Sequence, residues 1–388
     1  MFITLICVYF FAFILLARFL KEISIQDKIL SFLIVFMTSG FVYLSSILIL
    51  LFLIYDTFLV YKPKTNQLIQ MFFFVAIISV TSFLGNNNKV NFLEYLQLII
   101  FGLLLIFIRI RDYNYMKSVC TGFFIGSIII SASILISHFI FDSLSQETLV
   151  FFSISSTYNY TIYFLFFGLI ISSEFLFTRS SHKILCFFIF SMLSFLLQSR
   201  SGFTLGLLFF VLFTINVKIN FRSIFLLSTL SVAGFFTLNS SFIDKDNPND
   251  ILYSIVNFDN NTSNLERVQM VLGAFKTLNQ EPYGAGVGNT SSSLKKLGIS
   301  HPHAHNLLAN WVYELGYIGI ILTCFFFIFI LKSIRIRQSF SQQKFKIAII
   351  AYIIVMSVLN SLQFNIMVSL ITFFGISLAY SNDNYSEC

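Results

Sequence analysis

Residues 118–141 read SVCTGFFIGSIIISASILISHFIF, a run of 24 residues without Asp, Glu, Lys or Arg. A bilayer core of about 30 Å requires about 20 consecutive apolar residues in one helix, so this run is long enough to cross a membrane. Comparable runs fill most of the chain. We count twelve candidate spans, at 2–17, 29–60, 68–85, 94–110, 118–141, 160–177, 184–199, 202–217, 223–238, 305–331, 345–360 and 363–380.

The composition of the chain agrees with this pattern. Of the 388 residues, 57% are hydrophobic and 11% are charged, and the mean hydropathy is +0.86. Soluble domains carry about 25% charged residues, so an ordinary soluble protein is excluded. The five cysteines are scattered and form neither a disulfide framework nor a CxxC metal motif. The first apolar run, 2–17, lacks a basic start and a small-residue cleavage site, and we therefore expect a retained span rather than a signal peptide.

The basic residues predict which loops face the cytoplasm. Cytoplasmic loops are enriched in Lys and Arg, and 14 of the 24 basic residues lie in alternate loops. Those 14 residues are Lys62, Lys64, Arg109, Arg111, Lys117, Arg179, Lys183, Lys218, Arg222, Lys332, Arg335, Arg337, Lys344 and Lys346. The opposite loops, including the long segment 239–304, are then outside. Because the net charge of +7 is distributed in this way, we do not expect a nucleic-acid partner.

One region does not fit the alternation. Arg18, Lys21 and Lys28 resemble a cytoplasmic loop, but a single helix over 29–60 places them outside. Either that run of 32 residues forms two short spans, which gives thirteen in total, or the charge rule is broken there. The sequence leaves both possibilities open.

The segment 239–304 is the one long polar stretch and holds six acidic and five basic residues. Loops longer than about 12–15 residues are usually functional or disordered, and this one carries signals of order. Residues 263–266 read SNLE, which fits a capping box at the start of a helix. Apolar residues then follow at helical spacing, and Pro282 with Gly284 ends the run. The apolar residues are Leu265, Val268, Leu272, Phe275 and Leu278. We therefore predict an amphipathic helix on the outer membrane face or over a cavity.

Two arginines on the outer side are candidates for anion binding. Arg200 lies between two apolar runs, against the general charge bias, and the alternative for it is an interfacial side chain that snorkels to water. Arg267 lies one turn into the predicted helix, where free amides and a guanidinium suit a phosphate group. Its alternative is a solvated Arg paired with a nearby acid.

The third candidate is the sequence HPHAHN at 301–306, which holds three of the five histidines. Histidine transfers protons near neutral pH, so this segment is a candidate for acid or base catalysis. An H-x-H-x-H run can also bind zinc, but the sequence offers no Cys or second His cluster to complete a tetrahedral site. We therefore predict no metal and no other cofactor.

Further polar and glycine residues follow the histidines. Glu314 lies within the run 305–331, so we expect it to face the bundle interior and to orient a histidine or bind a sugar hydroxyl. Gly316 and Gly319 have the spacing of closely packed helices. The stretch PYGAGVGN at 282–289 lacks the context of a nucleotide-binding loop, and a tight turn is the better interpretation.

Taken together, these residues resemble the bacterial O-antigen polymerase and O-antigen ligase superfamily of lipid-carrier-dependent glycosyltransferases. The resemblance is carried by SRSG at 199–202, by Arg267 followed by Pro282 and a G-x-G-x-G stretch, and by an H-N-x9-G-x-x-G pattern from His305 to Gly319. It covers the C-terminal half, whereas the first 150 residues match only in being hydrophobic spans.

The resemblance implies an all-α, polytopic membrane fold of GT-C type, with about twelve transmembrane helices and one large periplasmic loop. It favours one long helix over 29–60. It also implies roles for particular residues: Arg200 and Arg267 bind the diphosphate of an undecaprenyl-linked glycan, and His305 is the base that deprotonates the acceptor hydroxyl. His303 is a supporting residue or a weaker base candidate, and Asn306 and Glu314 are candidate supporting or substrate-binding residues.

The predicted organisation has four parts: a helix bundle at 1–238, the periplasmic loop at 239–304, C-terminal helices at 305–380 and a cytoplasmic tail at 381–388. The function expected first is that of a metal-independent O-antigen polymerase in the bacterial inner membrane. A ligase that moves the polysaccharide to lipid A-core is the second expectation, and a lipid-linked oligosaccharide flippase or transporter is the third. The expected partners are the carrier-linked donor, a carrier-linked or lipid A-core acceptor, the bilayer and a chain-length regulator.

Overall fold

A computed structural model describes residues 2–141 apart from 22, 40–41, 86–90 and 109–111, residues 158–175, and residues 262–381 apart from 335–339 and 360–365, with four single positions at 193, 202, 205 and 206. All regular elements in these ranges are helices. The predicted spans 184–199, 202–217 and 223–238 lie almost wholly outside the described residues and stay predictions.

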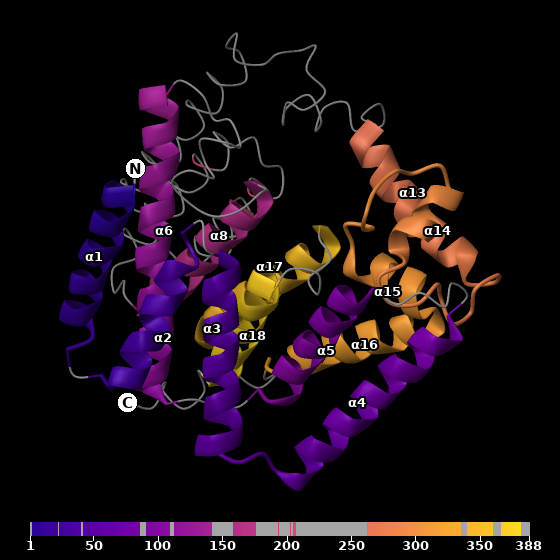
Figure 1. The fold of residues 1–388 in the computed structure, drawn as a ribbon, viewed down its shortest axis with the longest axis horizontal. Coiled ribbons are helices and arrows are strands. Elements are labelled where there is room, and N and C mark those ends of the chain that lie inside the picture. Colours follow the sequence, from indigo (N-terminus) through magenta and orange to yellow (C-terminus); the bar gives the residue numbers. More distant parts are fainter. Residues whose placement is uncertain are drawn as a thin grey trace.

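Outside the predicted loop 239–304, most of the described helices coincide with predicted apolar runs, and Figure 1 shows their arrangement. They are α1 (Phe2–Phe19), α2 (Ile25–Phe36), α3 (Val42–Tyr55) with its π-helical continuation η1 (Asp56–Val60), α4 (Thr65–Leu84), α5 (Phe92–Ile106), α6 (Tyr113–Phe141), α8 (Tyr158–Phe175), α13 (Thr262–Thr277), α14 (Thr290–Lys296), α15 (Leu307–Leu315), α16 (Tyr317–Leu331), α17 (Phe340–Leu359) and α18 (Ile366–Ser381). By length and composition, Tyr43–Val60, Thr65–Leu84 and Tyr113–Ile136 can each cross a membrane, and six shorter helices are also apolar. The all-α prediction is thus confirmed for the described residues.

The region 29–60 differs from what the resemblance implies. Instead of one long helix, the chain forms α2 and α3, separated by a turn at Met37–Ser39. In Figure 1 the connection between α1 and α2 lies toward the same lower end of the bundle as the connection between α3 and α4. The break therefore places the connection between α1 and α2 at the same end of the bundle as the connection between α3 and α4. Both connections carry basic residues, so the conflict with the charge rule is removed.

Hydrogen bonds between helix ends show which connections share a side of the bundle. Gln67 Nε2 near the start of α4 donates to the carbonyl of Ile106 at the end of α5, at 3.2 Å. At the opposite ends of these helices, Asn91 N donates to the carbonyl of Val287, at 3.3 Å. The connection between α4 and α5 thus lies on the same side as the segment 282–289, as the loop charges predicted.

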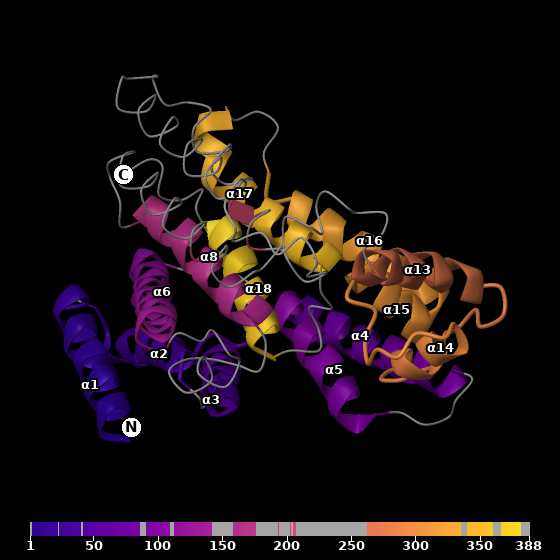
Figure 2. The ribbon, with the colours of Figure 1, turned by 90° about the horizontal axis from the view of Figure 1, so that it is seen from above.

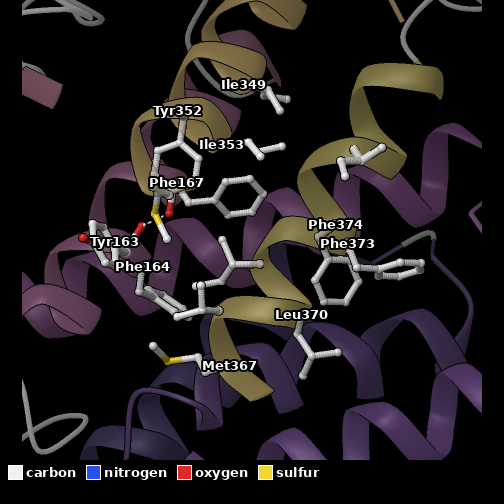
Figure 3. Close-up of a cluster of buried hydrophobic side chains, with 14 of the residues drawn as sticks. Tyr163, Phe164, Phe167, Ile349, Tyr352, Ile353, Met367, Leu370, Phe373 and Phe374 are labelled. Carbon is white, nitrogen blue, oxygen red and sulfur yellow. Dashed lines mark hydrogen bonds between the residues drawn. The ribbon is translucent and has the colours of Figure 1, made fainter. Parts of the chain in front are cut away.

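The core of the bundle is built from aromatic and branched side chains of α6, α8, α17 and α18. Figure 3 shows rings and aliphatic side chains of α8, α17 and α18 turned toward one another. Tyr352 on α17 donates its hydroxyl proton to the carbonyl of Tyr163 on α8, at 2.7 Å. The ring of Phe123 on α6 lies 4.7 Å from that of Phe167, in an edge-to-face arrangement. These contacts join helices that are distant in sequence.

Helices α13, α14 and α15 form a separate group at one end of the molecule, whereas α1 lies at the other end, in both Figure 1 and Figure 2. The predicted span 305–331 is divided at Gly316, between α15 and α16. Gly316 has a φ of +59° and a ψ of −132°, a backbone conformation that residues other than Gly rarely adopt. The chain folds back there, and α15 packs against both α13 and α16.

Candidate functional site

The predicted amphipathic helix is present as α13, Thr262–Thr277, and begins one residue before the predicted capping box. Its packed side is formed by Met270, Ala274 and Leu278, which lie in one buried cluster with residues of α14 and α15. The predicted apolar stripe is different: Leu265, Val268, Leu272 and Phe275 are between 42% and 56% exposed. Most of the stripe therefore does not serve to attach α13 to the protein.

The attachment of α13 to α15 depends on close backbone contact. Tyr313 on α15 donates its hydroxyl proton to the carbonyl of Met270, at 2.7 Å. Gly273 makes this approach possible, because a Cβ atom there would lie 2.6 Å from the Tyr313 hydroxyl oxygen. The residues at the start of α13, including Arg267, are thereby held in a fixed position relative to α15.

The histidine segment leads directly into α15. Asn306 is the N-cap residue of this helix, and its Oδ1 accepts a hydrogen bond from Ala309 N at 3.0 Å. The other side of the same amide, Nδ2, donates to the carbonyl of Val358 near the end of α17, at 3.2 Å. Asn306 therefore ties the start of α15 to the bundle.

His305 has a φ of +48°, one of two positive values among described residues other than glycine. A non-glycine residue in this region carries some conformational strain, and strained residues are enriched at functional sites. The residue is half-buried and immediately precedes the N-cap. The strain is held in place from both sides, because Ala304 N donates to Asn310 Oδ1 at 3.1 Å while Asn306 is anchored to α17.

The other two histidines of the segment have different surroundings. Burial lowers the pKa of His303 below its ordinary value of 6.5, so that His303 is neutral at physiological pH. His301 lies beside His305: their ring centroids are 5.3 Å apart and the ring planes are nearly perpendicular, at 76°. His301 Nε2 also lies 3.3 Å from Glu266 Oε2, on the first turns of α13. Glu266 directly precedes Arg267, so this contact brings the start of α13 to the histidines.

The glycine-rich segment 284–288 packs across the end of α15. Ala285 N donates to the carbonyl of Tyr313 at 2.8 Å, and Gly286 N donates to the carbonyl of Glu314 at 3.0 Å, so two carbonyls at the end of α15 gain partners. Gly284, Gly286 and Gly288 all have positive φ. The prediction of a tight turn is thus confirmed.

Glu314 is fully buried beneath this turn. Its Oε1 accepts a hydrogen bond from the Thr290 hydroxyl of α14, at 2.9 Å. A buried carboxyl group is stable only with such partners, so Glu314 joins α14 to α15. This position in the interior, eight residues beyond the N-cap of α15, favours a structural role over a direct contact with a sugar.

Comparison with known protein families gives a match to this part of the chain. Residues 185–324 match the O-antigen ligase family. A comparison with curated proteins gives no match. The matched segment is about a third of the chain, and it includes Arg200, Arg267, the histidine segment and Glu314. It therefore confirms the resemblance to this family on the region that holds the candidate residues.

Within the O-antigen ligase match, the structure describes some candidate residues and not others. Arg267, His303, His305, Asn306 and Glu314 are described, and they lie on α13, on α15 or on the segment that joins α14 to α15. Arg200 lies outside the described residues. Among the residues that the structure does describe, no group of three His, Cys, Asp or Glu side chains is arranged to hold a metal ion.

The sequence did not single out the contact between Glu266 and His301. Both residues belong to patterns that were noted, the capping box and the H-x-H-x-H run. They are 35 positions apart, however, and only the packing of α13 on α15 brings their side chains together. The charge of Glu266, next to Arg267 in the predicted helix, was the available signal.

Proposed function

We propose that this protein is a bacterial inner-membrane glycosyltransferase that acts as an O-antigen polymerase. It transfers the growing glycan from undecaprenyl diphosphate onto another carrier-linked repeat unit at the periplasmic face. One observation carries this proposal: the start of α13, where Arg267 follows Glu266, meets the strained His305 through His301, within the segment that matches the O-antigen ligase family.

The proposed reaction is a displacement at the anomeric carbon of the donor sugar. The acceptor hydroxyl oxygen attacks this carbon, the bond between carbon and phosphate oxygen breaks, and undecaprenyl diphosphate leaves. His305 accepts the proton of the acceptor hydroxyl, which makes that oxygen a better nucleophile. Negative charge develops on the leaving diphosphate, and Arg267 and Arg200 stabilise it with bidentate hydrogen bonds. We propose that no divalent metal is needed, because the guanidinium groups supply the positive charge.

The topology that we propose follows from the bundle ends. The segment 239–304 and the connection between α4 and α5 face the periplasm, while the basic loops face the cytoplasm. With α2 and α3 as separate spans and the other predicted spans unchanged, the proposed number of membrane segments is thirteen. In this arrangement α13, with its exposed apolar stripe, lies on the periplasmic side of the membrane.

An O-antigen ligase, which transfers the finished polysaccharide to lipid A-core, is the second candidate. The description of the matched family favours it, since that description names ligases. Both enzymes use the same donor, the same leaving group and the same proposed residues, so the acceptor alone distinguishes them.

A deletion strain examined by lipopolysaccharide gel tests the proposal. Loss of a polymerase leaves lipid A-core that carries a single repeat unit. Loss of a ligase leaves bare lipid A-core, while polymer accumulates on the carrier. If repeat units instead accumulate on the cytoplasmic leaflet, the protein is a flippase and the proposed glycosyl transfer is refuted.

A further inference from the structure

The side chains of Glu266, His301 and His305 form a continuous row from α13 to the start of α15. Glu266 Oε2 and His301 Nε2 are 3.3 Å apart, and the His301 ring lies edge-to-face with the His305 ring at 5.3 Å. Glu266 and His301 are 35 positions apart in the chain, so the row depends on tertiary structure. It connects the helix of Arg267 with the proposed base.

This row adds little to stability. The side chains of His301 and Glu266 are 39% and 45% exposed, and ion pairs with this much solvent contact contribute about 0–1 kcal/mol. The attachment of α13 to α15 rests instead on the buried cluster around Met270 and on the hydrogen bond from Tyr313. A change at Glu266 or His301 can therefore alter the histidines without unfolding the group of helices.

The row does restrict the orientation of rings. When His301 Nε2 carries a hydrogen, it donates a hydrogen bond to Glu266 Oε2. This hydrogen bond fixes both the orientation of the His301 ring and its tautomer. The His301 ring in turn limits the side-chain rotations open to His305, whose backbone is already fixed at a φ of +48°. A general base acts only from within hydrogen-bond distance of the proton that it accepts, so ring orientation controls the rate.

We propose that Glu266 and His301 are positioning residues that hold the His305 ring toward the acceptor hydroxyl. This inference rests on the proposed role of His305 as the base. It assigns a function to two residues that do not themselves take part in the proposed reaction. Glu266 acts through His301, and His301 acts through its ring contact with His305.

The test measures the steady-state rate of glycan transfer by the purified full-length protein. The substrate is the carrier-linked repeat unit extracted from a host strain that lacks the protein. Glu266→Ala and His301→Ala each lower kcat about 10-fold or more and leave KM within about twofold, because misplacement of a reacting group slows the chemical step. Glu266→Gln still presents a side-chain oxygen, now that of an amide, as an acceptor for His301, and it keeps most of kcat.

A double-mutant cycle tests the direction of the effect. If Glu266 acts only through His301, the double variant Glu266→Ala/His301→Ala is no slower than His301→Ala alone. Additive losses show instead that Glu266 contacts the substrate by itself, and they overturn the inference. Two controls accompany the cycle: Gln269→Ala, at an exposed position of α13, and Glu281→Gln, which weakens the ion pair with Lys296 elsewhere in the same group of helices. Both controls keep the kcat of the unmodified protein.

The variant His305→Ala separates this inference from the proposed function. If His305→Ala is inactive while Glu266→Ala and His301→Ala keep full kcat, the positioning role is wrong and the base remains assigned. If His305→Ala transfers glycan at the full rate, the base assignment is wrong and the positioning role falls with it. Fluorescence of Trp311, the single Trp of the chain, checks that each variant is folded.

Discussion

Replacement of Gly316 by Ala tests whether the turn between α15 and α16 holds the site together. Gly316 has a φ of +59°, and an added Cβ would lie 1.9 Å from the Pro282 carbonyl oxygen. The unfavourable backbone conformation costs about 1–3 kcal/mol, and the forced displacement of backbone atoms costs about 1–3 kcal/mol more. We therefore expect Gly316→Ala to lower the free energy of unfolding by about 4 kcal/mol.

Gly298 provides a matched control for this change. Its φ is +77°, but nothing lies within 4 Å of an added Cβ, so Gly298→Ala costs about 1–2 kcal/mol from the backbone alone. Trp311 on α15 reports unfolding, because it is 4% exposed and lies against the ring of Phe101. At about 2 °C per kcal/mol, the Tm of Gly316→Ala falls by about 8 °C and that of Gly298→Ala by about 3 °C. Equal shifts for the two variants would refute the contact at Pro282.

The remaining predictions concern charge and pH. Arg267→Lys impairs glycan transfer at least about 10-fold, since a point charge does not reproduce a bidentate fork; an unchanged rate returns Arg267 to a solvated surface role. Transfer survives EDTA, and loss of activity that Zn²⁺ or Mg²⁺ restores would show a metal requirement. The pKa of His303 is lowered in the folded protein, so as the pH falls below 6.5 the imidazole of His303 is protonated in the unfolded state before it is protonated in the folded state. The free energy of unfolding therefore decreases between pH 6.5 and the lowered pKa. We expect a smaller decrease for His303→Asn. Denaturant titrations at pH 7.5 and 5.5 measure the free energy of unfolding of both proteins and test this expectation.

Much of the fold could be predicted from hydrophobicity, because a membrane segment requires a long apolar run. Helices α4, α5, α6 and α8 begin and end within five residues of the predicted runs. Helix breaks were harder to predict. The turn at Met37–Ser39 and the turn at Gly316 both lie inside predicted apolar runs, where the few polar residues nearby, such as Thr38 and Glu314, do not by themselves predict an interruption. Gly316 belonged to a recognised spacing, but that spacing predicts neither its positive φ nor its close approach to the Pro282 carbonyl.

In the candidate site, too, some features could be predicted from local sequence and others depend on tertiary contacts. Arg267, His305 and Asn306 were identified from local patterns, and the structure gives Asn306 a definite function as N-cap and anchor. Glu314 was correctly expected in the interior, but its partner Thr290 lies 24 positions away and no local pattern links them. The partnership of Glu266 with His301 is also a tertiary contact. Residue type and spacing thus identify groups that can react, whereas packing determines which groups support them.

The proposed function depends most on the assignment of His305 as the base of a glycosyl transfer. The direct measurement incubates purified protein with carrier-linked repeat units and quantifies both the elongated glycan and the released undecaprenyl diphosphate. We expect equal amounts of the two products for the unmodified protein and neither for His305→Ala, whose Trp311 fluorescence stays that of a folded protein. Full release of undecaprenyl diphosphate by His305→Ala would contradict the assignment of His305 as the base.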